Sequence, residues 1–102
     1  MKELIYVNPH KEDNCEINKL NPNWETILSN YMTTHYVPCN KYEVHNHYFI
    51  GVDSVTDDTI NMFNRAKVTI YTIDHIVDCI AIKFKDEKSR DLVFDVLNKK
   101  VV

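Results

Sequence analysis

The sequence predicts an α+β fold: a single two-layer domain with about four mostly antiparallel strands in one sheet and two to three helices packed on one face. Three observations predict it. A stripe of apolar residues at helical spacing follows Asn21, two β-branched runs lie between residues 68 and 84, and a further amphipathic segment follows Asp86. Two packed layers are the simplest way to bury one face of a sheet and one stripe of each helix.

Length and composition limit the chain to one small domain. With 102 residues, of which 44% are hydrophobic and 26% charged, it can bury a single core and has the balance of an ordinary globular chain. We therefore expect one domain over residues 1–102. A cytoplasmic location is expected, because no apolar run is long enough to cross a membrane and the N-terminus lacks the features of a signal peptide. The three cysteines are then expected to be reduced thiols.

Charge and glycine content argue against several classes of function. The formal net charge of −3 argues against a nucleic-acid binder, whose binding surface is usually strongly basic. A single glycine, Gly51, cannot build a glycine-rich loop around a phosphate. Abundant Lys, Asn, Ile and Tyr beside little Gly, Ala and Arg is what an AT-rich genome encodes, and many bacteriophages of low-GC hosts and many low-GC bacteria share this composition.

The first half of the chain is predicted to contain two strands and one helix. Lys2–Val7 has the pattern of a strand that ends at a turn-forming Asn-Pro pair, and residues 8–21 that of a long surface loop. A helix then begins with Asn21 as its N-cap and ends before Pro38, and a strand covers residues 42–52. The apolar stripe of this helix consists of Trp24, Ile27, Leu28, Tyr31, Met32 and His35.

The second half is predicted to contain a short helix, a hairpin and a final helix. The short helix begins within Ser54–Asp58, the hairpin joins strands at 68–73 and 76–84, and the last helix runs from about residue 86 to 100. The resulting order, β-α-β-α-β-β-α, resembles ferredoxin-like arrangements. The expected buried positions are Ile60, Phe63 and Ala66 in the short helix, and Val93, Val96, Leu97 and Val101 in the last.

A candidate metal site lies in the predicted strand at 42–52. Alternate residues of a strand share a face, so Glu43, His45, His47 and Phe49 would lie together. A carboxylate and two imidazoles can bind zinc or iron. The sequence therefore predicts either a metal site at Glu43, His45 and His47, with zinc as its cofactor and hydrolysis as one use, or a polar strand face without any cofactor.

Cysteine catalysis has little support in the sequence. A nucleophilic thiol needs a neighbour, such as a histidine, that lowers its pKa. Cys39 is the only cysteine near several histidines in the sequence, whereas Cys15 lies in the predicted loop and Cys79 within an apolar strand. No catalytic residue is predicted.

The outer face of the predicted sheet, opposite the helices, is unusually apolar and aromatic for a solvated surface. Exposed patches of this kind favour a protein–protein interface, most simply with a second copy of the chain as a homodimer. One alternative is that the loop at 8–21 covers this face. Another is that its aromatic side chains stack on nucleic-acid bases. The predicted interface residues are His45, His47, Phe49, Tyr71, Ile73 and Val77.

The function expected from the sequence is that of a small, non-catalytic, cytosolic module that binds a protein partner. A phage or mobile-element origin would make it an inhibitor or accessory protein that acts on a host protein. The alternatives are a metal-binding, hydrolytic protein and a nucleic-acid accessory protein.

Overall fold

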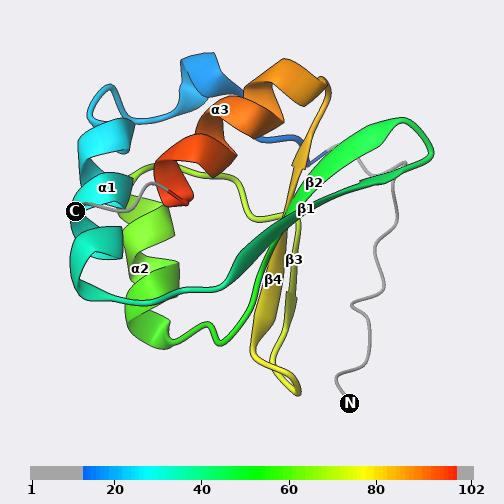
Figure 1. The fold of residues 1–102 in the computed structure, drawn as a ribbon. Helices are drawn as coiled ribbons and strands as arrows, with labels where there is room; N and C mark the ends of the chain where they lie inside the picture. The colour runs from blue at the N-terminus through cyan, green and yellow to red at the C-terminus, as the bar shows by residue number, and fades with distance from the viewer. Residues whose placement is uncertain (1–12, 99–102) are drawn as a thin grey trace.

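The computed structural model describes residues 13–98 and confirms the predicted fold class (Figure 1). The described strands form one antiparallel four-stranded sheet, and the helices lie on one side of it. The predicted strand Lys2–Val7 lies outside the described residues. Within residues 13–98, no helix is both long enough and apolar enough to span a bilayer. The elements are the 3₁₀-helix η1 (Ile17–Lys19), α1 (Trp24–Thr34), β1 (Cys39–Val44), β2 (His47–Val52), α2 (Asp57–Arg65), β3 (Thr72–Asp74), β4 (Cys79–Phe84) and α3 (Glu87–Leu97).

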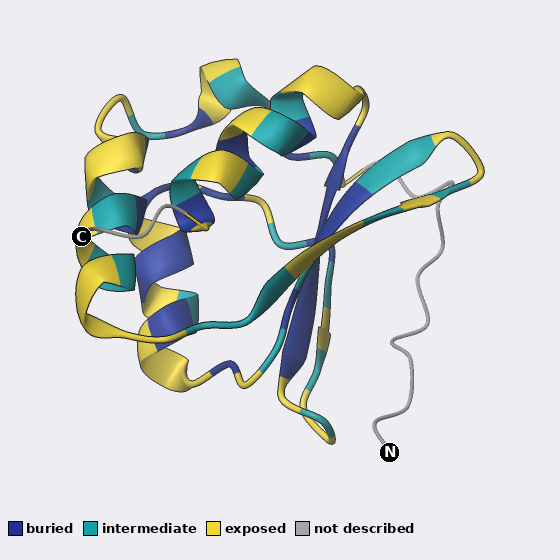
Figure 2. Ribbon diagram, viewed as in Figure 1, coloured by how far each residue is buried: buried dark blue, intermediate teal, exposed yellow. Residues whose placement is uncertain are grey.

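The sheet consists of two hairpins placed side by side. The strand order is β1-β2-β4-β3, so that β1–β2 and β3–β4 are hairpins and β2 pairs with β4 between them. Ile50 pairs with Ile82 in the register of β2 and β4, and Phe49 pairs with Lys83. β4 lies between two other strands, and all six of its residues are buried, as Figure 2 shows. This strand is the centre of the fold.

The core lies between the helices and one face of the sheet. Each helix contributes apolar side chains at the three- and four-residue spacing that brings them to one face. The sheet contributes alternate residues of β2 and β4, as its pleat requires. The fully or nearly fully buried side chains of this core include Trp24 and Leu28 of α1, Met62 and Phe63 of α2, Val93 and Leu97 of α3, Ile50 and Val52 of β2, and Ile80, Ile82 and Phe84 of β4.

The N-terminal end of α2 is fixed by two sets of hydroxyl contacts. The Thr56 hydroxyl accepts a hydrogen bond from the Thr59 amide at 3.3 Å, which satisfies one of the free amides at the start of the helix. The buried Thr59 hydroxyl in turn lies 2.8 Å from the hydroxyl of Tyr31 on α1. The start of α2 is therefore held against α1 and presents a defined surface.

A buried arginine joins α3 to the sheet. Arg90 is 6% exposed, and its guanidinium donates to the backbone oxygen of Tyr42 at 3.2 Å and to the Asp91 carboxylate at 3.0 Å. It also pairs with Glu87 at 3.3 Å and lies 5.4 Å from the ring centroid of Tyr48. A buried cation needs such partners to offset its lost hydration. The contacts therefore keep α3 in one position over β1 and β2.

The predicted single strand over residues 42–52 is wrong, because the chain reverses at His45 and Asn46. These two residues have φ of 49° and 62°, in the left-handed region that Asn and His tolerate better than most residues. Two consecutive left-handed residues form the turn that best fits the twist of a two-residue hairpin. Val44 accordingly pairs with His47, and six residues on each side form the ladder of β1 and β2.

The segment at 8–21 is not a loop exposed along its whole length. In its described part, Asn14 forms a parallel bridge with Lys83, and the Cys15 amide donates to the Lys83 oxygen at 2.7 Å. Cys15 and Leu20 are buried in the main core. Residues 14–15 therefore lie against β4 beyond the end of β3. The sequence did not predict this packing because the segment is mostly polar.

The β3–β4 hairpin has a longer turn than the sequence predicts. Residues 75–78 form it, so Ile76 and Val77 lie in the turn and not in a strand. The Asp74 carboxylate accepts hydrogen bonds from the Ile76 amide at 2.9 Å and the Val77 amide at 3.4 Å. Asp78 closes the turn with a φ of 52°. The hydrogen bonds of Asp74 and the left-handed backbone of Asp78 favour a turn, and they outweigh the strand preference of the two β-branched residues between them.

Candidate functional site

The turn at His45 and Asn46 separates the predicted metal ligands. Glu43 pairs with Tyr48, whereas His47 pairs with Val44. Residues paired across two strands share a face, and neighbouring pairs alternate, so Glu43 and His47 lie on opposite faces of the sheet. In the described part of the chain, no group of three or more His, Cys, Asp or Glu side chains is placed to hold a metal ion. The shared face that motivated a zinc site at Glu43, His45 and His47 does not form.

Two of the predicted interface residues are buried in an aromatic cluster on the outer face of the sheet. The rings of Tyr42 and Phe49 stack at 5.0 Å, and Phe49 meets Tyr71 edge-on at 5.8 Å. The Lys83 ammonium lies 5.2 Å from the Tyr71 ring centroid. Burial, with a smaller effect of Tyr71, raises the pKa of Tyr42 to about 12. Phe49 and Tyr71 thus pack within the chain, while His47 lies half-buried on the same face and His45 is exposed in the turn.

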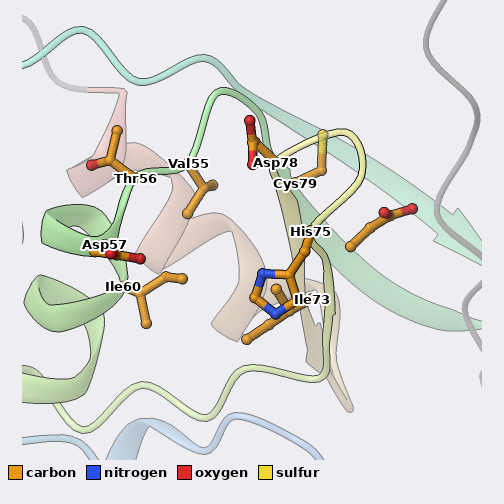
Figure 3. Close-up of a pocket in the computed structure, with 9 residues that line it drawn as sticks. Val55, Thr56, Asp57, Ile60, Ile73, His75, Asp78 and Cys79 are labelled. Atoms are coloured by element: carbon orange, nitrogen blue, oxygen red, sulfur yellow. The ribbon is translucent and has the colours of Figure 1, made fainter.

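The remaining two predicted interface residues lie at the turn end of the β3–β4 hairpin: Ile73 in β3 and Val77 in the turn. Ile73 lines a groove of about 220 Å³ between the start of α2 and the β3–β4 turn. Figure 3 shows this groove, with residues from the start of α2 on one side and residues of the hairpin on the other. The lining residues are Val55, Thr56, Asp57, Ile60, Ile73, Asp74, His75, Asp78 and Cys79.

One backbone and one side-chain hydrogen bond tie the two walls of this groove together. The Val55 amide donates to the Asp78 oxygen at 2.8 Å, and the Cys79 thiol donates to the Asp53 carboxylate at 2.9 Å. Ser54 and Asp78, on either side of this connection, both have left-handed backbone, with φ of 56° and 52°. Non-glycine residues in this region mark positions that the surrounding structure holds in place. The groove is therefore a fixed feature of the described fold.

Apolar side chains are exposed next to the groove. Ile76, at the tip of the turn, is 93% exposed, and Ile73 in the groove wall is 40% exposed. A single exposed isoleucine is common on protein surfaces, but here two are exposed at a hairpin whose groove is also lined by Val55 and Ile60. We call the groove together with Ile76 the turn-end surface.

The turn-end surface is strongly acidic. The segments that meet there, residues 53–64 and 72–82, contain no Lys or Arg. Residues 35–40, which also contain no Lys or Arg, meet the first of these segments where the Pro38 oxygen accepts a hydrogen bond from the Asp53 amide at 2.9 Å. The cationic side chains of the described residues lie in other segments. The acidic residues of these segments are Asp53, Asp57, Asp58, Asp74 and Asp78.

The cysteines of the described fold are free thiols, and two of them have raised pKa values. Burial, with the nearby charge of Asp53, raises the pKa of Cys39 to about 12. Burial likewise raises the pKa of Cys15 to about 11. Because the thiolate is the nucleophile, a raised pKa makes a thiol unreactive at neutral pH.

We therefore expect iodoacetamide to alkylate Cys15 and Cys39 slowly in the native protein and quickly in urea. The sign follows from the pKa, since the thiolate fraction rises only as the pH approaches values far above neutrality. Peptide mass spectrometry after timed quenching gives the rate at each cysteine. Rapid alkylation of Cys39 at pH 7 in folded protein would contradict this expectation and return Cys39 to consideration as a nucleophile.

Comparison of the chain with protein-family models, with curated proteins and with solved structures gives no match. The candidate site therefore depends on the geometry of this chain alone. Sequence reasoning placed Ile73 and Val77 in an interface but missed Ile76 and the groove. The available signal was the run Asp74-His75-Ile76-Val77-Asp78, in which turn-forming residues flank two apolar residues.

Proposed function

We propose that this protein is a small, non-catalytic, cytoplasmic protein-binding module that contacts its partner through the turn-end surface. The observation that carries the proposal is the exposure of Ile76 and Ile73 at a groove whose two walls are joined by hydrogen bonds. Binding energy in protein interfaces comes mainly from a few apolar or aromatic anchors that are buried on contact. An isoleucine presented at the tip of a short turn is suited to that role.

The size of the groove supports a protein partner over a small-molecule substrate. Pockets for small ligands usually enclose about 300–1,000 Å³. The turn-end groove, at about 220 Å³, is smaller than this. It fits one or two protein side chains. A metal-dependent activity and a nucleic-acid accessory role have no comparable support in the described part of the chain.

The role that composition and size favour is that of an inhibitor or accessory protein acting on a protein of a host cell. Such a module needs a stable scaffold and one surface, and the fold provides both within one small domain. A homodimer formed through the same surface is the competing arrangement, and the experiments below separate the two.

Photo-crosslinking from the turn tip tests the proposed function. A benzophenone amino acid placed at position 76 is expected to form discrete adducts with a partner protein in cells that naturally contain this chain, because the side chain there is 93% exposed at the turn tip. Excess unlabelled wild-type protein should abolish these adducts, and an Ile76→Asp competitor should not. Mass spectrometry of the adduct bands identifies the partner.

Position 92 provides the matched control, because Leu92 is also apolar and is 45% exposed, but lies on α3. The same amino acid at position 92 should not give the same adducts. Identical adducts from both positions, or none from position 76, would contradict the proposed function.

A further inference from the structure

The turn-end groove accommodates a long side chain of a partner. Val55, Ile60 and Ile73 supply apolar walls along which the methylene groups of such a side chain can lie. Asp57, Asp78 and the half-buried Asp74 supply carboxylates in the same lining. Lysine and arginine side chains combine an apolar stem with a charged head, and commonly bury the stem while the head contacts polar groups. The groove has the chemistry that matches them.

The charge around the groove strengthens this match. The segments that form the turn-end surface carry five aspartates and no Lys or Arg, namely Asp53, Asp57, Asp58, Asp74 and Asp78. Elsewhere in residues 13–98 the acidic side chains equal the Lys and Arg side chains in number, so the excess negative charge of the described residues belongs to these segments. Complementary charge directs association and favours one class of partner over another.

The dipole of α2 acts in the opposite direction but is the smaller effect. A helix N-terminus carries a partial positive charge of roughly half an elementary charge, which would repel a cation. Asp57 and Asp58 in the first turn of α2 carry two full negative charges. The local field at the start of α2 is therefore negative.

We infer that the occupant of the turn-end groove is a basic segment of a partner protein, in which a lysine or arginine enters the groove beside an apolar residue that covers Ile73 and Ile76. The inference rests on the proposed function and specifies the partner of the same surface. The apolar contact supplies affinity, and the aspartates select the basic side chain.

Selection from a random peptide library tests this occupant. The immobilised wild-type protein is expected to enrich peptides with Lys or Arg next to an apolar residue. The Asp57→Asn, Asp78→Asn double variant should bind a selected peptide on the order of tenfold more weakly in fluorescence anisotropy, since it loses two surface charges. Asparagine also tolerates the left-handed backbone of residue 78, so the turn should persist. Raising the NaCl concentration should weaken binding to the wild type more than to the double variant.

The matched charge control is Asp95→Asn, which removes one exposed carboxylate from α3 and should leave binding unchanged. Enriched peptides without basic residues, or equal binding to the double variant, would overturn the inference while leaving the proposed function intact if Ile76→Asp still abolishes binding. Equal binding to Ile76→Asp, or no enrichment above the bare support, would count against both. A dimer in size exclusion that Ile76→Asp converts to a monomer would assign the surface to a second copy and overturn the inference.

Discussion

Replacement of Phe63 with alanine is expected to lower the free energy of unfolding by about 3–5 kcal/mol, the usual cost of truncating a fully buried aromatic side chain. Phe63 is fully buried on α2, in the core formed with α1 and the sheet. This cost is the sum of two terms: the favourable free energy of burying the ring, which is lost, and the unfavourable free energy of the cavity that the ring leaves. A domain of this size is usually stable by about 5–15 kcal/mol, so the variant should lie close to its unfolding threshold. Urea denaturation followed by circular dichroism measures the change.

Tyr36→Ala is the control for this prediction, because Tyr36 is an aromatic residue that is 87% exposed. It should change the free energy of unfolding by less than about 0.5 kcal/mol, as is usual for exposed positions. A cost below about 1 kcal/mol for Phe63→Ala would mean that α2 does not pack on the core as described. The position of Asp57 and Ile60 in the groove wall, which depends on that packing, would then also be wrong.

Arg90→Ala is expected to lower the free energy of unfolding by about 2.5–4 kcal/mol. The estimate combines hydrogen bonds that involve a charged group, worth about 1.5–3 kcal/mol, with a cation–π contact of about 1 kcal/mol. The substitution removes the donors to the Tyr42 oxygen and the Asp91 carboxylate, and the contact with the Tyr48 ring. Thermal and urea unfolding of the variant measure the loss.

Arg90→Lys separates charge from geometry. Lysine keeps the positive charge but cannot reproduce the planar fork that reaches a carboxylate and a backbone oxygen together. It should therefore restore only part of the stability lost in Arg90→Ala. Equal stability of wild type and Arg90→Ala would contradict the role of this side chain in holding α3 on the sheet.

A second consequence of the same network concerns Asp91. Removal from water raises the pKa of this carboxyl, but hydrogen bonds and charge attraction from Arg90 and Lys41 together lower it below its usual value. A lowered pKa in the folded state means that the associated stability is present above the unfolded pKa and is lost as the pH falls through the folded one. Arg90 therefore contributes, besides packing, a stabilisation that is present near neutral pH and is lost in acid.

Periodicity in the sequence predicted the helices well because each has one buried face. Trp24 and Leu28 are buried as the stripe of the first helix required, and Phe63 and Val93 as those of the other two. The ends were less well placed. The prediction took Asn21 as the N-cap, whereas α1 begins at Trp24 after Asn23, and the Asn21 side chain accepts a hydrogen bond from the Asn23 amide at 2.9 Å.

Periodicity failed at residues 42–52 because a two-residue turn shifts the alternation. Within one strand, Val44 would share a face with Tyr48; across the turn it shares a face with His47 instead. The pattern of polar and apolar residues continues through the turn without a break in composition. Only the left-handed backbone of His45 and Asn46 marks the reversal, and the sequence signal for it is weak without a glycine.

The turn-end surface could not be predicted because it joins segments that are distant in sequence. Val55 and Asp78 meet through a backbone hydrogen bond, and residues 55–60 and 73–79 line one groove. Ile76 and Val77 were assigned to a strand for their β-branched side chains, although the Asp74 carboxylate binds both of their amides and holds them in the turn. Tertiary contacts form the groove, and hydrogen bonds from the Asp74 side chain form the turn. Neither produces a periodic pattern in the sequence.

An NMR titration tests most directly whether the turn-end surface is the binding surface. Isotope-labelled protein is titrated with a library-selected basic peptide, and amide shift changes are followed for residues 13–98. We predict changes concentrated at residues 53–60 and 73–79, which include the groove and the turn tip. Changes confined to the outer face of the sheet, around Tyr42, Phe49 and Lys83, would contradict this prediction and place binding on that face instead.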